Sequence, residues 1–242
     1  MLRSPPQSLA LESPMHFKDI QLINGGKHSE EKLSQNRYLT KYWENVRNLF
    51  SIHLVDGLDV AGISKLNIQL GEYEGPEYSP PDHRGIAVFK RKDFDFHEFS
   101  ALEEEEKDAA SLEYIESSLL TVCSESGVSA KVSKQLKQAC QAIREEGYEH
   151  IKLHKKTSKW HSSRKARAET KLHFRRGGID AYLEFIDKHG NVLGKHKIAD
   201  SRFWDGLWAD LWKGRWENDT FLITNRFGDT FVRIESAVDG AF

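Results

Sequence analysis

The sequence is poor in cysteine, with only Cys123 and Cys140 among 242 residues. Neither thiol lies in a Cys-x-x-Cys pair or beside a cysteine–histidine cluster, so no zinc-finger or thioredoxin-like motif is present. Both fall on the apolar faces of expected helices, where a thiol behaves as a small hydrophobic side chain. Because sparse cysteine is typical of a reducing compartment, we expect a cytoplasmic protein.

Long hydrophobic runs are also missing. No stretch approaches the roughly 20 apolar residues that a membrane-spanning helix needs, so we expect no membrane partner. The first ten residues contain Pro5 and Pro6 but no apolar run, which is unlike a secretory signal. Residues 1–14 are therefore predicted to form a flexible tail.

Motifs for catalysis and phosphate binding are absent as well. The glycine pairs at positions 25–26 and 177–178 belong neither to a dinucleotide-binding pattern nor to a P-loop. No Gly-x-Ser-x-Gly elbow occurs, and neither cysteine lies in an obviously electropositive turn. We therefore expect a protein that is not an enzyme and uses no cofactor.

One histidine pair has a spacing that could suit a metal. His150 and His154 are four residues apart and would share a helix face. The chain between and after them is rich in lysine, and these positive charges oppose binding of a divalent ion. No metal site is predicted, and both histidines are expected to be exposed.

Hydrophobic residues make up 38% of the chain and aromatic residues 11%, which is enough for a real core. Residues 15–242 are predicted to form a single domain, helix-rich over 29–150 and β-rich over 170–236. Helices are expected over residues 29–50, 100–127 and 129–147, and strands over 17–23, 66–70, 86–89, 179–186, 192–198, 220–224 and 230–234. Strands that follow one another, with the helices elsewhere, indicate an α+β fold: an antiparallel sheet packed against a helical hairpin and further helices.

Helix caps support all three of the expected helix starts. Ser29 precedes two glutamates and can cap the first helix, and Ser129 can cap the third. Ser100 and Glu103 have the spacing of a capping box, in which two side chains satisfy two free backbone N–H groups at a helix start.

Tryptophan recurs every fourth residue near the end of the chain, at Trp204, Trp208, Trp212 and Trp216. Residues four apart share one face of a helix, so this spacing predicts a helix with a column of indoles. Three or four buried indoles would account for roughly 450–1,000 Å² of surface. We expect this column to lie in the core beneath the sheet, with a docking surface as the alternative.

Charge is unevenly distributed, although the net charge is only −2. Residues 93–125 contain eleven carboxylates and one lysine, a net charge of about −10, and residues 130–176 carry about +10. A negative surface accelerates association with a basic partner. The residues predicted to bind such a partner are Asp93, Asp95, Glu98, Glu103, Glu104, Glu106, Asp108, Glu113 and Glu116.

The basic stretch 152–176 supports an alternative. It contains Trp160, His161, His173 and Phe174 among its lysines and arginines. Basic side chains can contact phosphates while aromatic rings stack on bases, a combination typical of proteins that bind single-stranded nucleic acid. An RNA- or DNA-binding role for this stretch therefore stays open.

Two segments resemble a recurrent pattern in uncharacterised bacterial α+β proteins of the toxin-immunity type. The first runs from Phe94 to Lys107 and continues through Leu112 to Ile115, and the second is the Trp-x-x-Asp-x-Phe sequence from Trp216 to Phe221. The resemblance covers roughly residues 84–234 and implies a non-catalytic, protein-binding role. Together with the acidic block, it predicts an immunity protein that neutralises a bacterial toxin, such as a basic nuclease, through its acidic surface.

Overall fold

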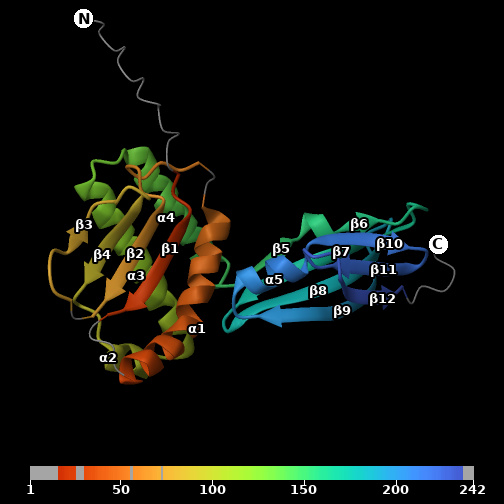
Figure 1. Ribbon diagram of the computed structural model, residues 1–242, viewed down its shortest axis with the longest axis horizontal. Coiled ribbons are helices and arrows are strands. Elements are labelled where there is room, and N and C mark those ends of the chain that lie inside the picture. The colour runs from red at the N-terminus through yellow and green to blue at the C-terminus, as the bar shows by residue number, and fades with distance from the viewer. Residues whose placement is uncertain (1–15, 26–29, 55–56, 72, 237–242) are drawn as a thin grey trace, which may run out of the picture.

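The first half of the chain builds a four-stranded sheet in a computed structural model that describes residues 16–25, 30–54, 57–71 and 73–236 (Figure 1). The expected tail and the Ser29 cap lie outside the described residues. The strands are β1 (Asp19–Asn24), β2 (Lys65–Leu70), β3 (Tyr78–Ser79) and β4 (Ile86–Arg91). Their order is β1-β2-β4-β3, and the alternating Leu66, Ile68 and Leu70 are fully buried on one face.

This first sheet differs from the predicted one in strand direction. β1, β2 and β4 run parallel, and only β3 is antiparallel to its neighbour β4. Parallel neighbours require a connection that crosses the sheet. The helix α1 (Glu30–His53) supplies this crossover between β1 and β2 and packs against β1.

Three further helices follow: α2 (Phe96–Ala101), α3 (Glu104–Glu125) and α4 (Ala130–Glu145). The predicted helical hairpin is confirmed by the packing of α3 against α4. Gly127 and Gly147, with φ of +63° and +65°, follow the ends of these two helices. The predicted cap at Ser100 is wrong, because Ser100 lies inside α2, which ends before Leu102. Glu103 instead caps α3, in a capping box with Glu106.

The strands of the second, β-rich half of the chain, from His150 to Glu235, pair antiparallel, as predicted. One sheet contains β5 (His150–Leu153), β6 (Lys159–Trp160), β7 (Ala166–Arg175), β8 (Gly178–Asp187) and β9 (Val192–Ser201), with β5 and β6 both pairing with β7. The short 3-10 helix η1 (Lys155–Thr157) joins β5 to β6. A second sheet has the order β10-β11-β12 (Lys213–Glu217, Thr220–Thr224 and Thr230–Glu235). The whole chain is thus α+β.

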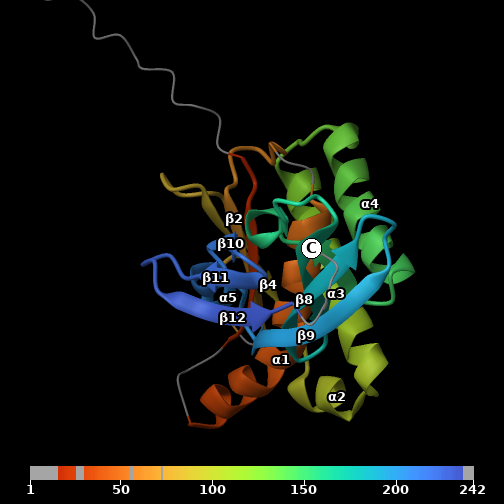
Figure 2. The same ribbon diagram turned by 90° about the vertical axis from the view of Figure 1, so that its right-hand side faces the viewer.

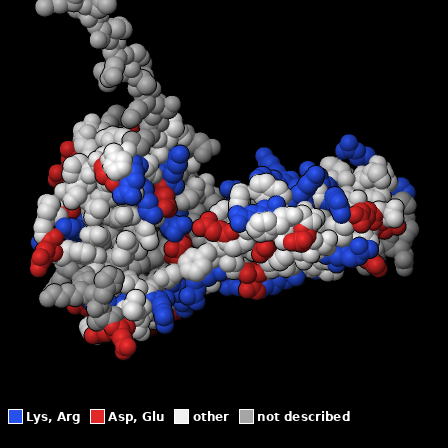
Figure 3. Space-filling view, viewed as in Figure 1, with Lys and Arg blue, Asp and Glu red and all other residues white. Residues whose placement is uncertain are grey.

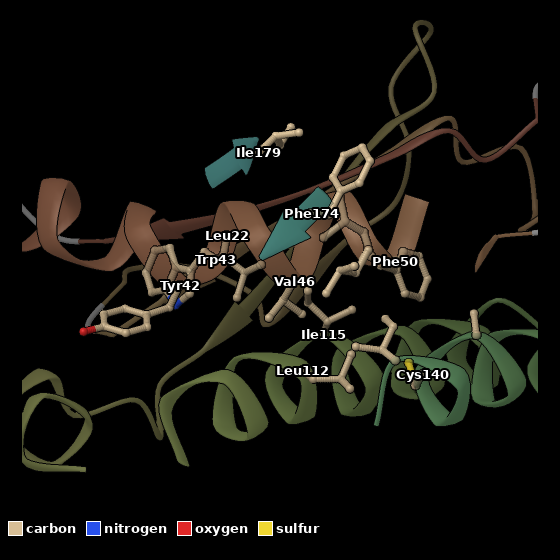
Figure 4. Packing of buried hydrophobic residues seen from close by; sticks show 14 of the residues in the cluster. Leu22, Tyr42, Trp43, Val46, Phe50, Leu112, Ile115, Cys140, Phe174 and Ile179 are labelled. Carbon is tan, nitrogen blue, oxygen red and sulfur yellow. The ribbon is translucent and has the colours of Figure 1, made fainter. Parts of the chain in front are cut away.

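α1 lies between the two halves (Figures 1 and 2). It contacts β1, α3 and α4 on the helical side and β7 and β8 on the other. Phe174 and Ile179 of the β-rich half lie beside α1, and they belong to the same hydrophobic cluster as Val46 and Phe50 of that helix (Figure 4). One hydrophobic cluster therefore runs through both halves, and the single domain over residues 15–242 stays a prediction.

The tryptophan stretch forms a shorter helix than expected. α5 covers only Trp204–Asp210, and Trp216 lies in β10. Leu207 and Leu211 provide the buried contacts, whereas the side chains of Trp208 and Trp212 are 38% and 37% exposed. The predicted column of buried indoles is therefore wrong: α5 ends at Asp210, and pairing with β11 draws residues 213–217 into a strand. Of the four indoles, Trp204 and Trp216 pack against the core.

No helix among the described residues is both long and apolar enough to cross a membrane.

Candidate functional site

Four of the nine acidic residues predicted to bind a partner form ion pairs with other residues of the chain. Asp93 pairs with Arg91, and Glu116 pairs with Arg144. Glu104 accepts hydrogen bonds from Lys41 Nζ at 2.9 Å and Tyr42 Oη at 2.8 Å, which lower the pKa of Glu104 to about 2.

Asp108, the fourth, is buried rather than exposed as expected. Its carboxylate lies 2.7 Å from the guanidinium of Arg176. Burial raises the pKa of Asp108, against the opposing effect of Arg176. Because Arg176 belongs to the turn after β7, this pair joins α3 to the β-rich half and leaves no charge for an external partner.

Three more of the nine acids stabilise helix starts. Asp95 accepts hydrogen bonds from the backbone N–H groups of His97 and Glu98 at the start of α2. Glu103 and Glu106 form the capping box of α3. Only Glu98 and Glu113 have exposed side chains without an ion pair or side-chain hydrogen bond to the described residues. Four of the nine acids are thus paired within the chain, and the other five are exposed and form no ion pair with a described residue, so the predicted binding surface stays a prediction.

The basic stretch 152–176 divides into two parts. From residue 167 onwards its charges are balanced: Arg167 contacts Glu169 at 2.6 Å, and Lys171 contacts Glu184 at 2.5 Å. Arg175 contacts the buried Asp180 at 2.6 Å. This part of β7 carries an internal ladder of opposite charges.

The other part, around β5, η1 and β6, is not balanced in this way. Its lysines are all exposed, and none forms an ion pair with an acid of the described ranges: Lys152, Lys155, Lys156 and Lys159. Figure 3 shows acidic and basic side chains interspersed over much of one face, with Lys and Arg gathered along the upper edge of the β-rich half. This edge is where the structure leaves positive charge available.

Exposed aromatic rings lie beside these lysines. Lys156 Nζ is 4.3 Å from the ring centroid of Trp212 and 5.8 Å from that of Trp208. The two indoles meet edge to face, with centroids 5.1 Å apart. Trp160, 40% exposed, has the guanidinium of Arg167 5.1 Å from its ring. A cation within about 6 Å of an indole is stabilised by the π-electrons of the ring.

Two adjacent grooves run between these side chains. The larger, about 620 Å³, lies between α1, β5 and α5, and Phe174 and Trp204 line it. The smaller, about 420 Å³, passes Lys159 and Trp160. Leu153 and Lys155 line both grooves, so the two are adjacent. Volumes of about 300–1,000 Å³ are typical of ligand sites.

The grooves and their lysines and indoles are called here the basic–aromatic surface. Its members are Lys152, Leu153, Lys155, Lys156, Lys159, Trp160, Trp208 and Trp212.

η1 fixes two of the lysines in place. Thr157, its last residue, is fully buried, and its Oγ1 lies 2.8 Å from His154 Nδ1. Gly214 of β10 approaches the carbonyl oxygen of Thr157 so closely that a Cβ there would lie 2.6 Å from it. β10 therefore packs against the buried side of η1, and the side chains of Lys155 and Lys156 are exposed to solvent.

His154 also lines the larger groove, and its ring lies 6.0 Å from that of Trp204. Burial lowers its pKa, and the positive charges of Lys156 and Lys152 lower it further. The lowered pKa favours the neutral form of the His154 imidazole.

His150 and His154 do not form the pair that their spacing suggests, because the chain between them is the extended strand β5 and not a helix. His150 begins this strand, and His154 follows its last residue. His150 instead approaches His53 and Glu146, and one potential ligand atom from each residue lies within 4.8 Å of the others. This group could hold a metal ion and was not predicted.

No protein-family model, curated protein or solved structure matches the chain.

The sequence predicts the basic stretch with Trp160, but it does not predict that Lys156 contacts Trp208 and Trp212. The spacing of Trp208 and Trp212 suits a helix face and therefore predicts a core position for both. Their exposure beside Lys156 depends on the fold of the β-rich half, and nothing local to either segment indicates it.

Proposed function

We propose that the protein binds single-stranded nucleic acid through the basic–aromatic surface. The observation that carries the proposal is the set of four exposed lysines without acidic partners among the described residues, together with the exposed indoles of Trp208 and Trp212 beside Lys156. A single strand offers one phosphate per nucleotide for the lysines and an accessible face of each base for stacking. A duplex hides its base faces, so the indoles favour a single strand.

The competing proposal is the toxin-neutralising role. It rests on the resemblance and on the acidic block, and it stays a prediction. Four of the nine acids that would carry it form ion pairs within the chain, and the other five are exposed and form no ion pair with a described residue. The basic–aromatic surface keeps four lysines available for a ligand and adds exposed indoles beside Lys156, a combination that suits one class of ligand.

A salt titration tests the proposal. We expect a fluorescein-labelled 12-nucleotide single strand to show increased anisotropy when the protein is added at low salt. The logarithm of the binding constant should fall with the logarithm of salt concentration with a slope of roughly −0.7 per phosphate contacted. Four lysines predict a slope of about −3. No binding at 50 mM salt would overturn the proposal.

Charge-reversal variants locate the surface. The double variant Lys155→Glu/Lys156→Glu should weaken binding strongly and reduce the magnitude of the salt slope by about 1.4. The matched control is Lys131→Glu/Lys134→Glu, which changes the net charge equally at two exposed lysines of α4. Equal losses in both variants would indicate a non-specific effect of net charge and count against the surface.

A tryptophan variant separates stacking from charge. Trp212→Ala should weaken binding by roughly 5- to 150-fold, because an aromatic ring stacked on a base contributes about 1–3 kcal/mol. Phe227→Ala is the control, since Phe227 is 73% exposed in the turn between β11 and β12. Binding to Trp212→Ala at wild-type strength would exclude stacking at this position.

A further inference from the structure

Three side chains that are far apart in the sequence meet at the junction of the two halves. His53 is the last residue of α1, Glu146 caps the end of α4 and His150 begins β5. His53 Nε2 lies 3.0 Å from Glu146 Oε2, and His150 Nδ1 lies 2.9 Å from the same oxygen. The two imidazole rings approach edge to face, with centroids 5.2 Å apart.

This arrangement is close to that of a zinc site with an open coordination position. Zinc binds imidazole nitrogen and carboxylate oxygen at about 2.0–2.2 Å in tetrahedral geometry, which places neighbouring ligand atoms about 3.3 Å apart. The distances from Glu146 Oε2 to the two imidazole nitrogens lie within a few tenths of an ångström of this value, and all three ligand atoms are within 4.8 Å of one another. Small side-chain rotations would complete the geometry.

We propose that His53, Glu146 and His150 bind a divalent transition-metal ion, with zinc preferred. Two imidazoles and one carboxylate suit zinc better than magnesium or calcium, which favour oxygen ligands. A water molecule would occupy the fourth position, as in other zinc sites with three protein ligands.

The surroundings allow an ion to enter and to be held. The side chains of His53, His150 and Glu146 are 14%, 24% and 38% exposed, so the site is shielded but open on one side. α1 and α4 both end here, and the C-terminal end of a helix carries partial negative charge that stabilises a cation.

The neighbouring positive charges do not block the site. Arg144 is paired with Glu116. Lys152 lies two residues further along β5, and its long exposed side chain can turn towards solvent. Lys152 should reduce the affinity without preventing binding.

A bound ion would join α1 and α4 of the helical half to β5 of the β-rich half. β5 carries Lys152 and Leu153, so the ion would also fix one edge of the basic–aromatic surface. The metal site does not depend on the proposed function, because its ligands are separate from that surface.

The test is isothermal titration of the metal-free full-length protein with zinc chloride at pH 7.5. We expect one ion per chain and a higher melting temperature with zinc. Cobalt(II) in place of zinc should give the visible absorption of a four-coordinate site. No heat of binding and no cobalt spectrum would overturn the proposal and leave these residues as a hydrogen-bonded bridge.

Single substitutions identify the ligands. Glu146→Gln, which keeps the size of the side chain, and His150→Gln should each weaken zinc binding by at least about tenfold, because even the loss of a group that only orients a ligand costs 10- to 100-fold. Circular dichroism establishes that each variant is folded. Unchanged affinity in a folded variant would contradict the site.

The matched control is His173→Gln. His173 Nε2 lies 2.8 Å from Glu149 Oε2 in another histidine–carboxylate pair with similar histidine exposure, but this pair is not part of a three-ligand group in the described chain. We expect wild-type zinc affinity in this variant. A loss as large as that of His150→Gln would show that zinc binds non-specifically to surface histidines.

Discussion

At the scale of single residues, the pair of Asp108 and Arg176 shows how the two charge blocks are used. The sequence places these residues in blocks of opposite sign, and the structure buries the carboxylate against the guanidinium. An ion pair of this kind contributes little net stability, because both charges lose their hydration. Removing only one partner is much more costly, since it leaves an uncompensated charge in the interior.

We therefore predict that Arg176→Ala lowers the free energy of unfolding by about 3 kcal/mol at pH 7. Adding Asp108→Asn should recover part of this loss, because the buried group is then neutral. Urea denaturation measures both. Arg164→Ala is the control, since Arg164 is exposed and has no ion pair with the described residues, and a change within about 0.5 kcal/mol is expected. A similar small change in Arg176→Ala would contradict the assigned role.

The residue scale also shows where sequence reasoning is limited. The sequence gives the total charge of each block, but it does not predict which partner each charged side chain contacts. Whether Glu104 faces a partner or Lys41 depends on the packing of α3 against α1, which brings together residues 63 positions apart. Likewise, Lys156 and Trp212 meet only because η1 and β10 pack together.

At the scale of secondary-structure elements, the close contact between η1 and β10 positions the proposed binding surface. A Cβ at Gly214 would lie 2.6 Å from the Thr157 carbonyl oxygen and 2.7 Å from Phe221 Cζ. The backbones can approach this closely only with glycine at this position. Lys155 and Lys156 belong to η1, whose position depends on this contact.

We predict that Gly214→Ala destabilises the protein by about 1–3 kcal/mol through overpacking and also weakens nucleic-acid binding by displacing η1. Thermal unfolding and the anisotropy assay measure the two effects. Gly194→Ala in β9 is the control, because its Cβ would meet its nearest neighbours at ordinary distances of 3.5 and 3.7 Å. Equal stability of both variants would show that the contact can relax.

Most elements could be predicted from the sequence because their signals are local. The alternation of Leu66, Ile68 and Leu70 identifies β2, and the turn from Asp187 to Asn191 identifies the β8–β9 hairpin. Strand direction in the first sheet could not be predicted, because the same alternation suits a parallel or an antiparallel neighbour. The indole spacing correctly indicated the start of α5 but gave no sign that β11 would recruit Trp216.

At the scale of the whole molecule, α1 couples the two halves. Its buried residues contact the first sheet, the helical hairpin and the β-rich half within one hydrophobic cluster. Elements that share a core usually unfold together. The position of α1 thus supports a single cooperative unit.

We predict a single unfolding transition in urea. Circular dichroism at 222 nm follows the helices, which lie almost entirely in the first half. Tryptophan fluorescence follows mainly the second half, which contains five of the six tryptophans. The two curves should coincide. Separate midpoints would show that residues 15–242 form two independently folding domains.

The position of β5 has a consequence for association between molecules. β5 is an edge strand, and its exposed Ile151 and Leu153 could pair with a strand of a second molecule. It is only four residues long, carries Lys152 and is followed at once by η1, and short charged edges of this kind resist strand addition. The lysine that could attract a nucleic acid thus also repels another copy of the same edge, and replacing it with an apolar residue would expose the protein to aggregation.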